Sequence, residues 1–329
     1  MPRYDHGGDI YAMPEIPLDF SVNTNPLGMP APVLQALRDR AEEFTRYPDP
    51  HCRELTAAIA AHENVPPEWI LCGNGAADLI YRICYALRPK RALVRPPTFS
   101  EYERALLQVG CRVETQGFSP GIDLLFLCRP NNPTGELMAL ESLKDILIRA
   151  ARNGTRVVVD ECFLEFTEAP SCKHFLREMP GLIVLKAFTK TYALAGLRLG
   201  YLLTPDAALR ESVSAAGACW SVSVPAQIAG IAALGCTGWL EDTRRLVATE
   251  RAYLSRELGA LGLTVFPSQA NFLLLQSKRP LYRPLLERGI LVRSCASFAG
   301  LDESYTRVAV KTRPENTRLV QAVKEVFYG

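Results

Sequence analysis

One lysine of this chain, Lys190, has a sequence context that favours covalent chemistry on a carbonyl compound. It lies in the run K-A-F-T-K-T-Y-A-L-A-G-L-R-L-G-Y, residues 186–201, directly after an apolar segment. An apolar neighbourhood lowers the pKa of a lysine, and the neutral amine can then form an imine. An isolated lysine is usually a solvated surface charge, but the spacing of Gly196, Arg198 and Gly200 favours a functional role.

Three other segments carry glycines or polar residues directly after predicted strands. In C-G-N-G-A-A-D (72–78) a helix follows a glycine turn, which suits a phosphate, although the motif taken alone favours an ordinary strand-to-helix turn. The asparagines and prolines of R-P-N-N-P-T-G (129–135) are explained in two ways. They form an ordinary turn, or they place a carboxamide side chain at the carboxyl end of a strand, where α/β proteins bind ligands. Asp160, after three valines, either caps the next element or pairs with a pyridinium nitrogen.

The elements that position these residues alternate between short apolar runs and longer helical patterns. This alternation predicts a mainly parallel sheet covered by helices. An earlier helical pattern places Val33, Leu34, Leu37, Ala41 and Phe44 on one face. The strands predicted for the sheet are 69–72, 91–94, 111–115, 124–128, 156–160, 182–185 and 200–203.

The character of the sequence changes near residue 239, where a long charged helix (240–261) is predicted. Strands follow at 272–276, 290–293 and 306–310, and a last helix follows Pro314. We therefore predict an N-terminal arm (1–30) lying over the large domain or the mouth of a site, a large domain (31–238) and a small C-terminal α/β domain (239–329).

Composition and charge narrow the function classes. The 329 residues carry a formal net charge of +2 with interspersed signs, which argues against nucleic-acid or membrane partners. No apolar run is long enough to span a bilayer and the start lacks the pattern of a signal peptide, so we expect a cytoplasmic protein. The ten cysteines lie mostly in apolar runs and the four histidines lack metal-ligand spacing, so we predict no metal site.

Taken in order, the motifs resemble those of fold-type I enzymes of the aminotransferase superfamily, which depend on pyridoxal-5'-phosphate (PLP). The resemblance rests on G-N-G-A-A-D, P-N-N-P-T-G, V-V-D-E and T-K-x-x-A-L-A-G-L-R-L-G-Y, and it extends to the strand at 306–310. It implies an α/β fold with a mainly parallel seven-stranded sheet in the large domain and a smaller C-terminal α/β domain. The most similar subgroup comprises histidinol-phosphate aminotransferases and the L-threonine-O-3-phosphate decarboxylases of cobalamin biosynthesis.

The resemblance also implies roles for individual residues around the cofactor. Lys190 would hold PLP as a Schiff base and then move protons, and Asp160 would pair with the pyridine nitrogen. Asn132 would bond the ring 3'-oxygen, and Phe99 would stack on the ring. The cofactor phosphate would be held by Ala76 and Ala77 through their N–H groups, by Arg198, and by Tyr47 of a partner subunit, which implies a homodimer with shared sites.

For the substrate, a small phosphorylated amino acid, the resemblance implies that Arg307 clamps the carboxylate. Candidates for the substrate phosphate are His6, Asn25, Arg293 and Lys311. The alternative for Arg293 and Lys311 is ordinary surface charge, which for Lys311 is at least as well supported.

Three positions depart from the family pattern. Phe163 replaces a tyrosine that bonds the 3'-oxygen, so Asn132 is left to do this alone. Ala187 replaces a phosphate-binding Ser or Thr, for which Thr189 is the candidate substitute. The stretch 115–124 is also shorter than is typical, which implies a trimmed loop and helix.

The N-terminus favours the decarboxylase reading. H-G-G-D (6–9) and D-F-S-V-N-T-N-P-L-G-M-P (19–30) resemble the opening of threonine-phosphate decarboxylases, whereas histidinol-phosphate aminotransferases usually lack the H-G-G element. We predict decarboxylation of threonine phosphate or serine phosphate, with an aminotransferase using 2-oxoglutarate and glutamate as the alternative. A non-catalytic PLP-fold sensor would need an appended DNA-binding segment, for which the chain has no basic patch and no helix-turn-helix.

Overall fold

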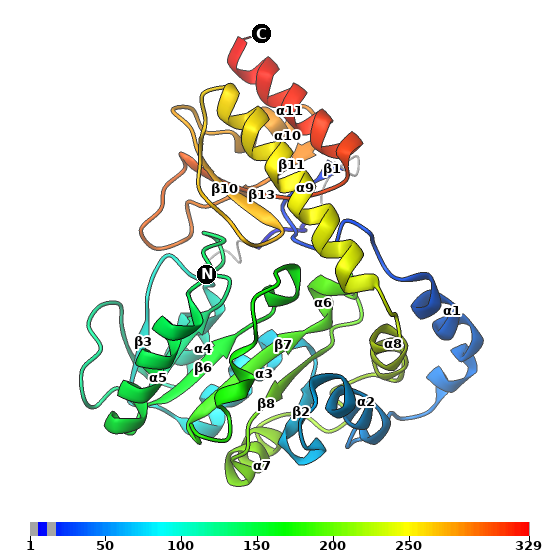
Figure 1. Ribbon diagram of the computed structural model, residues 1–329, viewed down its shortest axis with the longest axis vertical. Helices are drawn as coiled ribbons and strands as arrows, with labels where there is room; N and C mark the ends of the chain where they lie inside the picture. Colours follow the sequence, from blue (N-terminus) through cyan, green and yellow to red (C-terminus); the bar gives the residue numbers. More distant parts are fainter. Residues whose placement is uncertain (1–5, 12–17, 329) are drawn as a thin grey trace.

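The computed structural model describes residues 6–11 and 18–328. The chain forms a seven-stranded sheet, which with its helices is here called the large domain. In Figure 1 it lies below a smaller sheet flanked by the long helices α9 (Trp239–Ala260) and α11 (Arg313–Tyr328), here called the small domain. The order of the large sheet is β2-β8-β7-β6-β5-β3-β4, and β8 is the antiparallel strand among otherwise parallel neighbours. This arrangement confirms the predicted fold class.

The strands of the large sheet agree closely with the prediction from the apolar runs. The edge strand expected at 111–115 is shorter, because the residues on either side of it leave the sheet. The observed strands are β2 (Ile70–Gly73), β3 (Arg91–Val94), β4 (Arg112–Glu114), β5 (Leu124–Cys128), β6 (Arg156–Asp160), β7 (Leu182–Ala187) and β8 (Gly200–Leu203).

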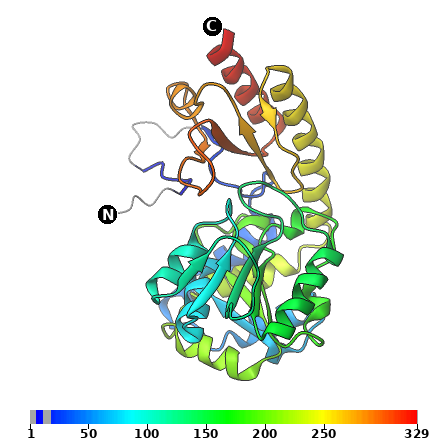
Figure 2. The same ribbon diagram turned by 90° about the vertical axis from the view of Figure 1, so that its left-hand side faces the viewer.

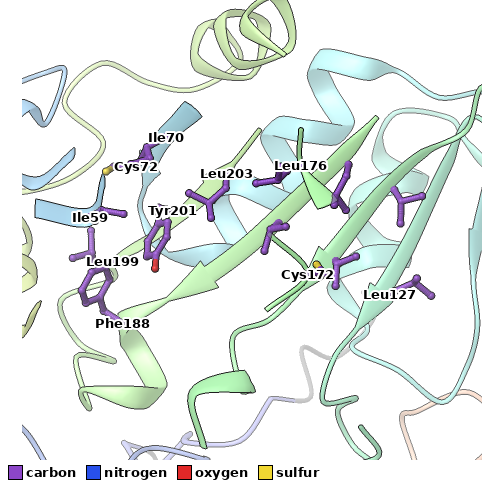
Figure 3. Close-up of a cluster of buried hydrophobic side chains, with 14 of the residues drawn as sticks. Ile59, Ile70, Cys72, Leu127, Cys172, Leu176, Phe188, Leu199, Tyr201 and Leu203 are labelled. Atoms are coloured by element: carbon purple, nitrogen blue, oxygen red, sulfur yellow. The ribbon is translucent and has the colours of Figure 1, made fainter. Parts of the chain in front are cut away.

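Helices cover both faces of this sheet, so successive residues of a central strand are buried in opposite directions. In β6, Val157 and Val159 pack into the cluster drawn in Figure 3, whereas Val158 points into the cluster on the other face. The first face is covered by α2 (Arg53–Glu63), α5 (Leu140–Asn153) and α8 (Val224–Leu234), and the second by α3 (Gly75–Leu87), α4 (Glu101–Gln108) and α7 (Ala207–Ala215).

The prediction of a single helix that carries Val33 through Phe44 on one face is wrong in the length of the helix. The observed α1 (Ala31–Asp39) stops early and a 3-10 turn (Ala41–Thr45) follows. Val33 is buried, but Leu34 and Phe44 are exposed at 42% and 43%. The apolar stripe is therefore divided between the core and the surface.

The small domain contains an antiparallel sheet of order β12-β13-β10-β9, formed by β9 (Thr264–Val265), β10 (Phe272–Gln276), β12 (Arg293–Ser294) and β13 (Tyr305–Ala309). Helices α9 (Trp239–Ala260) and α11 (Arg313–Tyr328) pack along it, and α10 (Tyr282–Leu286) is short. Figure 2 shows α9 running from the large domain up the side of the small one.

The strand predicted at 290–293 is two strands in different sheets. β11 (Ile290–Leu291) pairs in parallel with β1 (Leu18–Asp19), whereas β12 pairs with β13. The N-terminal segment therefore adds a strand to the small domain, and Phe20 is fully buried in that domain's core. The part of the predicted arm at residues 1–5 and 12–17 lies outside the described residues.

Within the described part of the chain, no helix combines the length and apolar character that a bilayer crossing requires. The described residues also contain no cluster of three or more histidine, cysteine or acidic side chains suited to a metal ion. All ten cysteines are free thiols.

Candidate active site

A cavity of about 480 Å³ is lined by residues of both domains and of the N-terminal segment. From the large domain it receives the ends of β5, β6 and β7 and the start of α3, which is where an α/β sheet binds ligands. The predicted site residues that line it are His6, Ala76, Ala77, Phe99, Asn132, Asp160, Thr189, Lys190, Arg198, Arg293 and Arg307.

Lys190 lies on α6 (Phe188–Thr191), a single turn that follows β7 without a loop. Burial lowers the pKa of Lys190 to about 8, and the positive charge of Arg307 acts in the same direction. Near neutral pH the amine is therefore much closer to its reactive neutral form than an ordinary lysine is.

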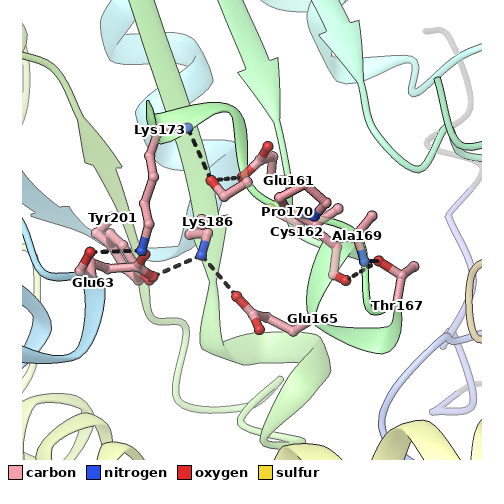
Figure 4. A network of polar contacts seen from close by, with 12 residues as sticks. Glu63, Glu161, Cys162, Glu165, Thr167, Ala169, Pro170, Lys173, Lys186 and Tyr201 are labelled. Atoms are coloured by element: carbon pink, nitrogen blue, oxygen red, sulfur yellow. Dashed lines mark hydrogen bonds and ion pairs between the residues drawn. The ribbon is translucent and has the colours of Figure 1, made fainter. Parts of the chain in front are cut away.

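Lys186, four positions earlier, is held in the opposite state. Its Nζ lies 2.8 Å from Oε1 of Glu63 and 2.8 Å from Oε1 of Glu165 (Figure 4). Burial opposes the effect, but these two carboxylates raise the pKa of Lys186. Lys186 therefore has a structural role in anchoring β7, whereas Lys190 is the lysine suited to react.

Asp160, at the end of β6, is fixed by donors on both of its oxygens. The Tyr102 hydroxyl donates to Oδ2 at 2.6 Å, and the Cys162 N–H donates to Oδ1 at 2.9 Å. Asp160 is only 5% exposed. The carboxyl group is therefore held in a fixed orientation where it lines the cavity.

A tight backbone junction forms the end of the cavity beside α3. Gly75 has φ +84°, and a Cβ on Gly200 would lie 2.7 Å from the Ala76 nitrogen. The first N–H groups of a helix have no intrahelical acceptor, so Ala76 and Ala77 present donors that suit a phosphate. A Cβ on Gly75 would meet the Arg198 guanidinium at 2.8 Å, so this cation lies beside the same helix start.

The small domain contributes two arginines, from neighbouring strands, to the lining of the same cavity. Arg293 on β12 and Arg307 on β13 are direct cross-strand partners, and both are more than nine-tenths buried. Burial lowers the pKa of Arg307 to about 10, and the charge of Arg293 contributes to the shift. Two like charges forced together away from water favour an anionic ligand between or beside them.

Arg307 is partly tied to the rest of the site. Its guanidinium donates to Oδ1 of Asn132 at 2.5 Å and to the Ser21 carbonyl at 2.8 Å, while its buried Nε has no hydrogen-bond partner among the described residues. The Oδ1 atom of Asn23, another lining residue, is also buried without a partner. A polar ligand in the cavity could supply the hydrogen bonds that Arg307 Nε and Asn23 Oδ1 lack among the described residues.

His6 reaches the cavity through a bond to the large domain. Its Nε2 lies 2.8 Å from Oε1 of Glu101, and its ring is 6.1 Å from that of Phe99. Burial opposes ionisation, but the bonds from His6 and Tyr81 lower the pKa of Glu101 to about 2. An ionised Glu101 therefore holds the His6 segment at the cavity wall.

Three predicted residues lie outside the cavity lining. The Asn25 side chain donates to the Thr191 carbonyl and to Thr243, so its amide ties the N-terminal segment to α6 and α9 rather than facing a substrate. The Lys311 ammonium lies 3.4 Å from Glu315. Both side chains therefore have partners within the chain, and a role of either in substrate binding stays a prediction.

Tyr47, the third, is 80% exposed and packs on Trp220 with ring centroids 4.7 Å apart. It is a surface residue of the single chain, where a partner subunit could reach it.

Sequence reasoning missed several residues of the site. Tyr102 carries a signal in retrospect, since it follows Phe99 at a spacing of one helical turn. Glu101 and Asn23 carry no local signal, because their positions depend on distant contacts. Phe163 and Ala187, two of the departures from the family pattern, both line the cavity, and neither side chain brings a hydroxyl to it.

The comparisons with known proteins are consistent across sequence and structure. Residues 15–323 match the family model for aminotransferase class I and II. The chain is 39% identical to the threonine-phosphate decarboxylase of Salmonella typhimurium, with 98% of this chain and 97% of that protein covered. It is 36% identical to the histidinol-phosphate aminotransferase of Symbiobacterium thermophilum, over 92% of this chain and 88% of that protein.

The similar solved structures include members of both groups. The L-threonine-O-3-phosphate decarboxylase of Porphyromonas gingivalis superposes with a TM-score of 0.88 at 26% identity, covering 94% of this chain and 99% of that one. The histidinol-phosphate aminotransferase of Clostridium acetobutylicum gives a TM-score of 0.87 at 28% identity, covering 93% and 98%.

Proposed function

The chain belongs to the aminotransferase class I and II family, and from that premise we propose that it decarboxylates L-threonine-O-3-phosphate to (R)-1-amino-2-propanol phosphate, a building block of the cobalamin nucleotide loop. PLP is the cofactor of this family and of this chain, as predicted. The observation that carries the choice of reaction is the position of His6, whose H-G-G segment is held at the cavity wall by Glu101. The similarity to a threonine-phosphate decarboxylase over 98% of the chain supports it.

The cavity suits PLP in the chemistry of its donors. The N–H groups of Ala76 and Ala77, with Arg198, would hold the cofactor phosphate at the start of α3. Asp160 would face the ring nitrogen, and Asn132 the ring 3'-oxygen. When bound, PLP withdraws electrons from whichever bond to the substrate Cα is aligned with its π system.

The residues of this chain then decide which bond is aligned. Arg307 would hold the substrate carboxylate and Arg293 the phosphate, and two fixed anionic groups define the rotation about the Cα bonds. Lys190, with its lowered pKa, would deliver a proton to Cα after carbon dioxide leaves. The same groups would support transamination if the Cα proton were aligned instead, so positioning decides the reaction.

The decisive experiment supplies threonine phosphate to the purified, PLP-loaded protein without any keto acid. We expect continuous turnover with release of carbon dioxide. A single stoichiometric burst that resumes when 2-oxoglutarate is added would instead establish the aminotransferase alternative, which the similarity to histidinol-phosphate aminotransferases supports. Parallel assays with serine phosphate measure the contribution of the substrate methyl group.

We further propose that the active form is a homodimer in the cytoplasm. Exposed apolar side chains gather on the segment that carries Tyr47, where Leu34 and Phe44 are also exposed and Trp220 packs against the tyrosine ring. A second copy covering this surface would bring Tyr47 to the neighbour's cofactor phosphate.

A further inference from the structure

Tyr102 occupies a place in the site that none of the family roles described above uses. It is fully buried on α4, and its hydroxyl donates to Oδ2 of Asp160 at 2.6 Å. Burial and the charge of Asp160 raise the pKa of the Tyr102 phenol, so the group stays protonated and acts as the donor.

Aromatic packing fixes the ring that carries this hydroxyl. The Tyr102 ring stacks on Phe126 of β5 at 4.9 Å with an interplanar angle of 10°, and it meets Phe99 edge to face at 5.5 Å. Phe99 lies just before α4 and Tyr102 lies in its first turn, so the segment that opens this helix brings one ring to the cavity and the other to the Asp160 carboxylate. The donor therefore has little freedom to move away from Asp160.

The geometry points to Tyr102 as a positioning residue that aims the Asp160 carboxylate and supplies a hydrogen bond to its Oδ2, so that the proton of the Asp160–cofactor pair stays on the ring nitrogen. Without the hydroxyl, Oδ2 of this largely buried carboxylate would lose the donor that the structure gives it. A buried carboxylate that loses a hydrogen bond takes up a proton more readily. The shared proton would then move from the ring nitrogen toward Asp160, and the cofactor would withdraw electrons less strongly.

This inference rests on the PLP assignment and does not depend on which substrate is used. The test replaces Tyr102 by Phe and loads the protein with PLP that carries an isotope label at its ring nitrogen. The nitrogen chemical shift reports protonation directly, before any substrate is added. We expect the shift to move toward the unprotonated value, the dissociation constant for PLP to rise about tenfold, and kcat to fall with little change in KM.

Tyr201→Phe is the matched control. Tyr201 is also buried and also donates to a carboxylate, Oε1 of Glu63 at 2.5 Å, but it lies outside the cavity lining. It should lose comparable stability without any change in the ring-nitrogen shift. An unchanged shift in a folded, PLP-loaded Tyr102→Phe protein would overturn the proposal, and so would an equal shift in the control.

A second variant covers the case in which Tyr102→Phe fails to fold. A ring-fluorinated tyrosine placed at position 102 alone keeps the hydroxyl and makes it a stronger donor. The proposal requires the ring-nitrogen shift to move toward the protonated value or remain at its limit, while activity is retained. Movement toward the unprotonated value would contradict it. Failure of decarboxylation with threonine phosphate, by contrast, would count against the proposed reaction and leave this measurement intact.

Discussion

Two lysines four positions apart on one segment have opposite environments. Lys186 forms ion pairs with the carboxylates of Glu63 and Glu165, which raise its pKa, whereas burial and Arg307 lower the pKa of Lys190 to about 8. This difference explains chemically why Lys190 is the residue expected to hold the cofactor.

We expect the rate of PLP uptake by the apoprotein to rise with pH and to level off above a midpoint near 8, because the neutral amine is the nucleophile. An ordinary lysine would keep gaining up to about pH 10. Rapid-mixing absorbance measures the rate, and removing the charge in Arg307→Gln should move the midpoint upward. Borohydride reduction followed by mass spectrometry should locate the cofactor on Lys190, and its appearance on another lysine would disprove the assignment.

Arg293 is the residue that we expect to bind the substrate phosphate. Its replacement by Ala should impair phosphorylated substrates far more than free threonine, with a loss of about 2–5 kcal/mol in transition-state binding. Arg288, exposed in the same domain, gives the control Arg288→Ala. The measurement is kcat/KM for both substrates, and an equal loss for free and phosphorylated threonine would place the phosphate elsewhere.

At the scale of elements, the junction of β8 and α3 depends on a glycine. In Gly200→Ala the new Cβ would press on the Ala76 nitrogen at 2.7 Å, the Gly75 carbon at 2.9 Å and the Lys186 oxygen at 3.0 Å, all of them backbone atoms. Such overpacking costs about 1–3 kcal/mol, and the displaced helix start should also weaken PLP binding.

The same motif supplies the control for this change. A Cβ on Gly196 meets nothing within 4 Å, so Gly196→Ala should leave both stability and PLP affinity nearly unchanged. Denaturant unfolding and PLP titration measure the two effects. Equal behaviour of the two variants would show that the close approach at Gly200 does not shape the phosphate site.

At the scale of the whole molecule, the shared-site hypothesis can be tested by complementation. Mixing inactive Lys190→Ala chains with Tyr47→Ala chains should restore part of the activity, because one site of each mixed dimer then carries neither change. Sedimentation analysis must establish that mixed dimers form. If they form and remain inactive, Tyr47 does not serve the neighbouring site.

The sequence by itself determined the residues that follow strands. Lys190, Asp160 and Asn132 each come just after an apolar run, and the carboxyl ends of parallel strands meet at one edge of a sheet. Local pattern is sufficient there, because a helix between two strands returns the chain so that the second strand runs parallel to the first. The family resemblance added the roles, and the order of the motifs along the chain carried that resemblance.

Only the tertiary structure decided the residues whose roles depend on distant contacts. Tyr102 meets Asp160 across 58 positions and His6 meets Glu101 across 95, while Asn25 is tied to Thr191 across 166. The same applies to the strand predicted at 290–293. Its first half pairs with β1 and its second half with β13, so the segment is divided between two sheets. A hydrogen bond between residues so far apart depends on how the domains and the N-terminal segment pack, and no local periodicity encodes that packing.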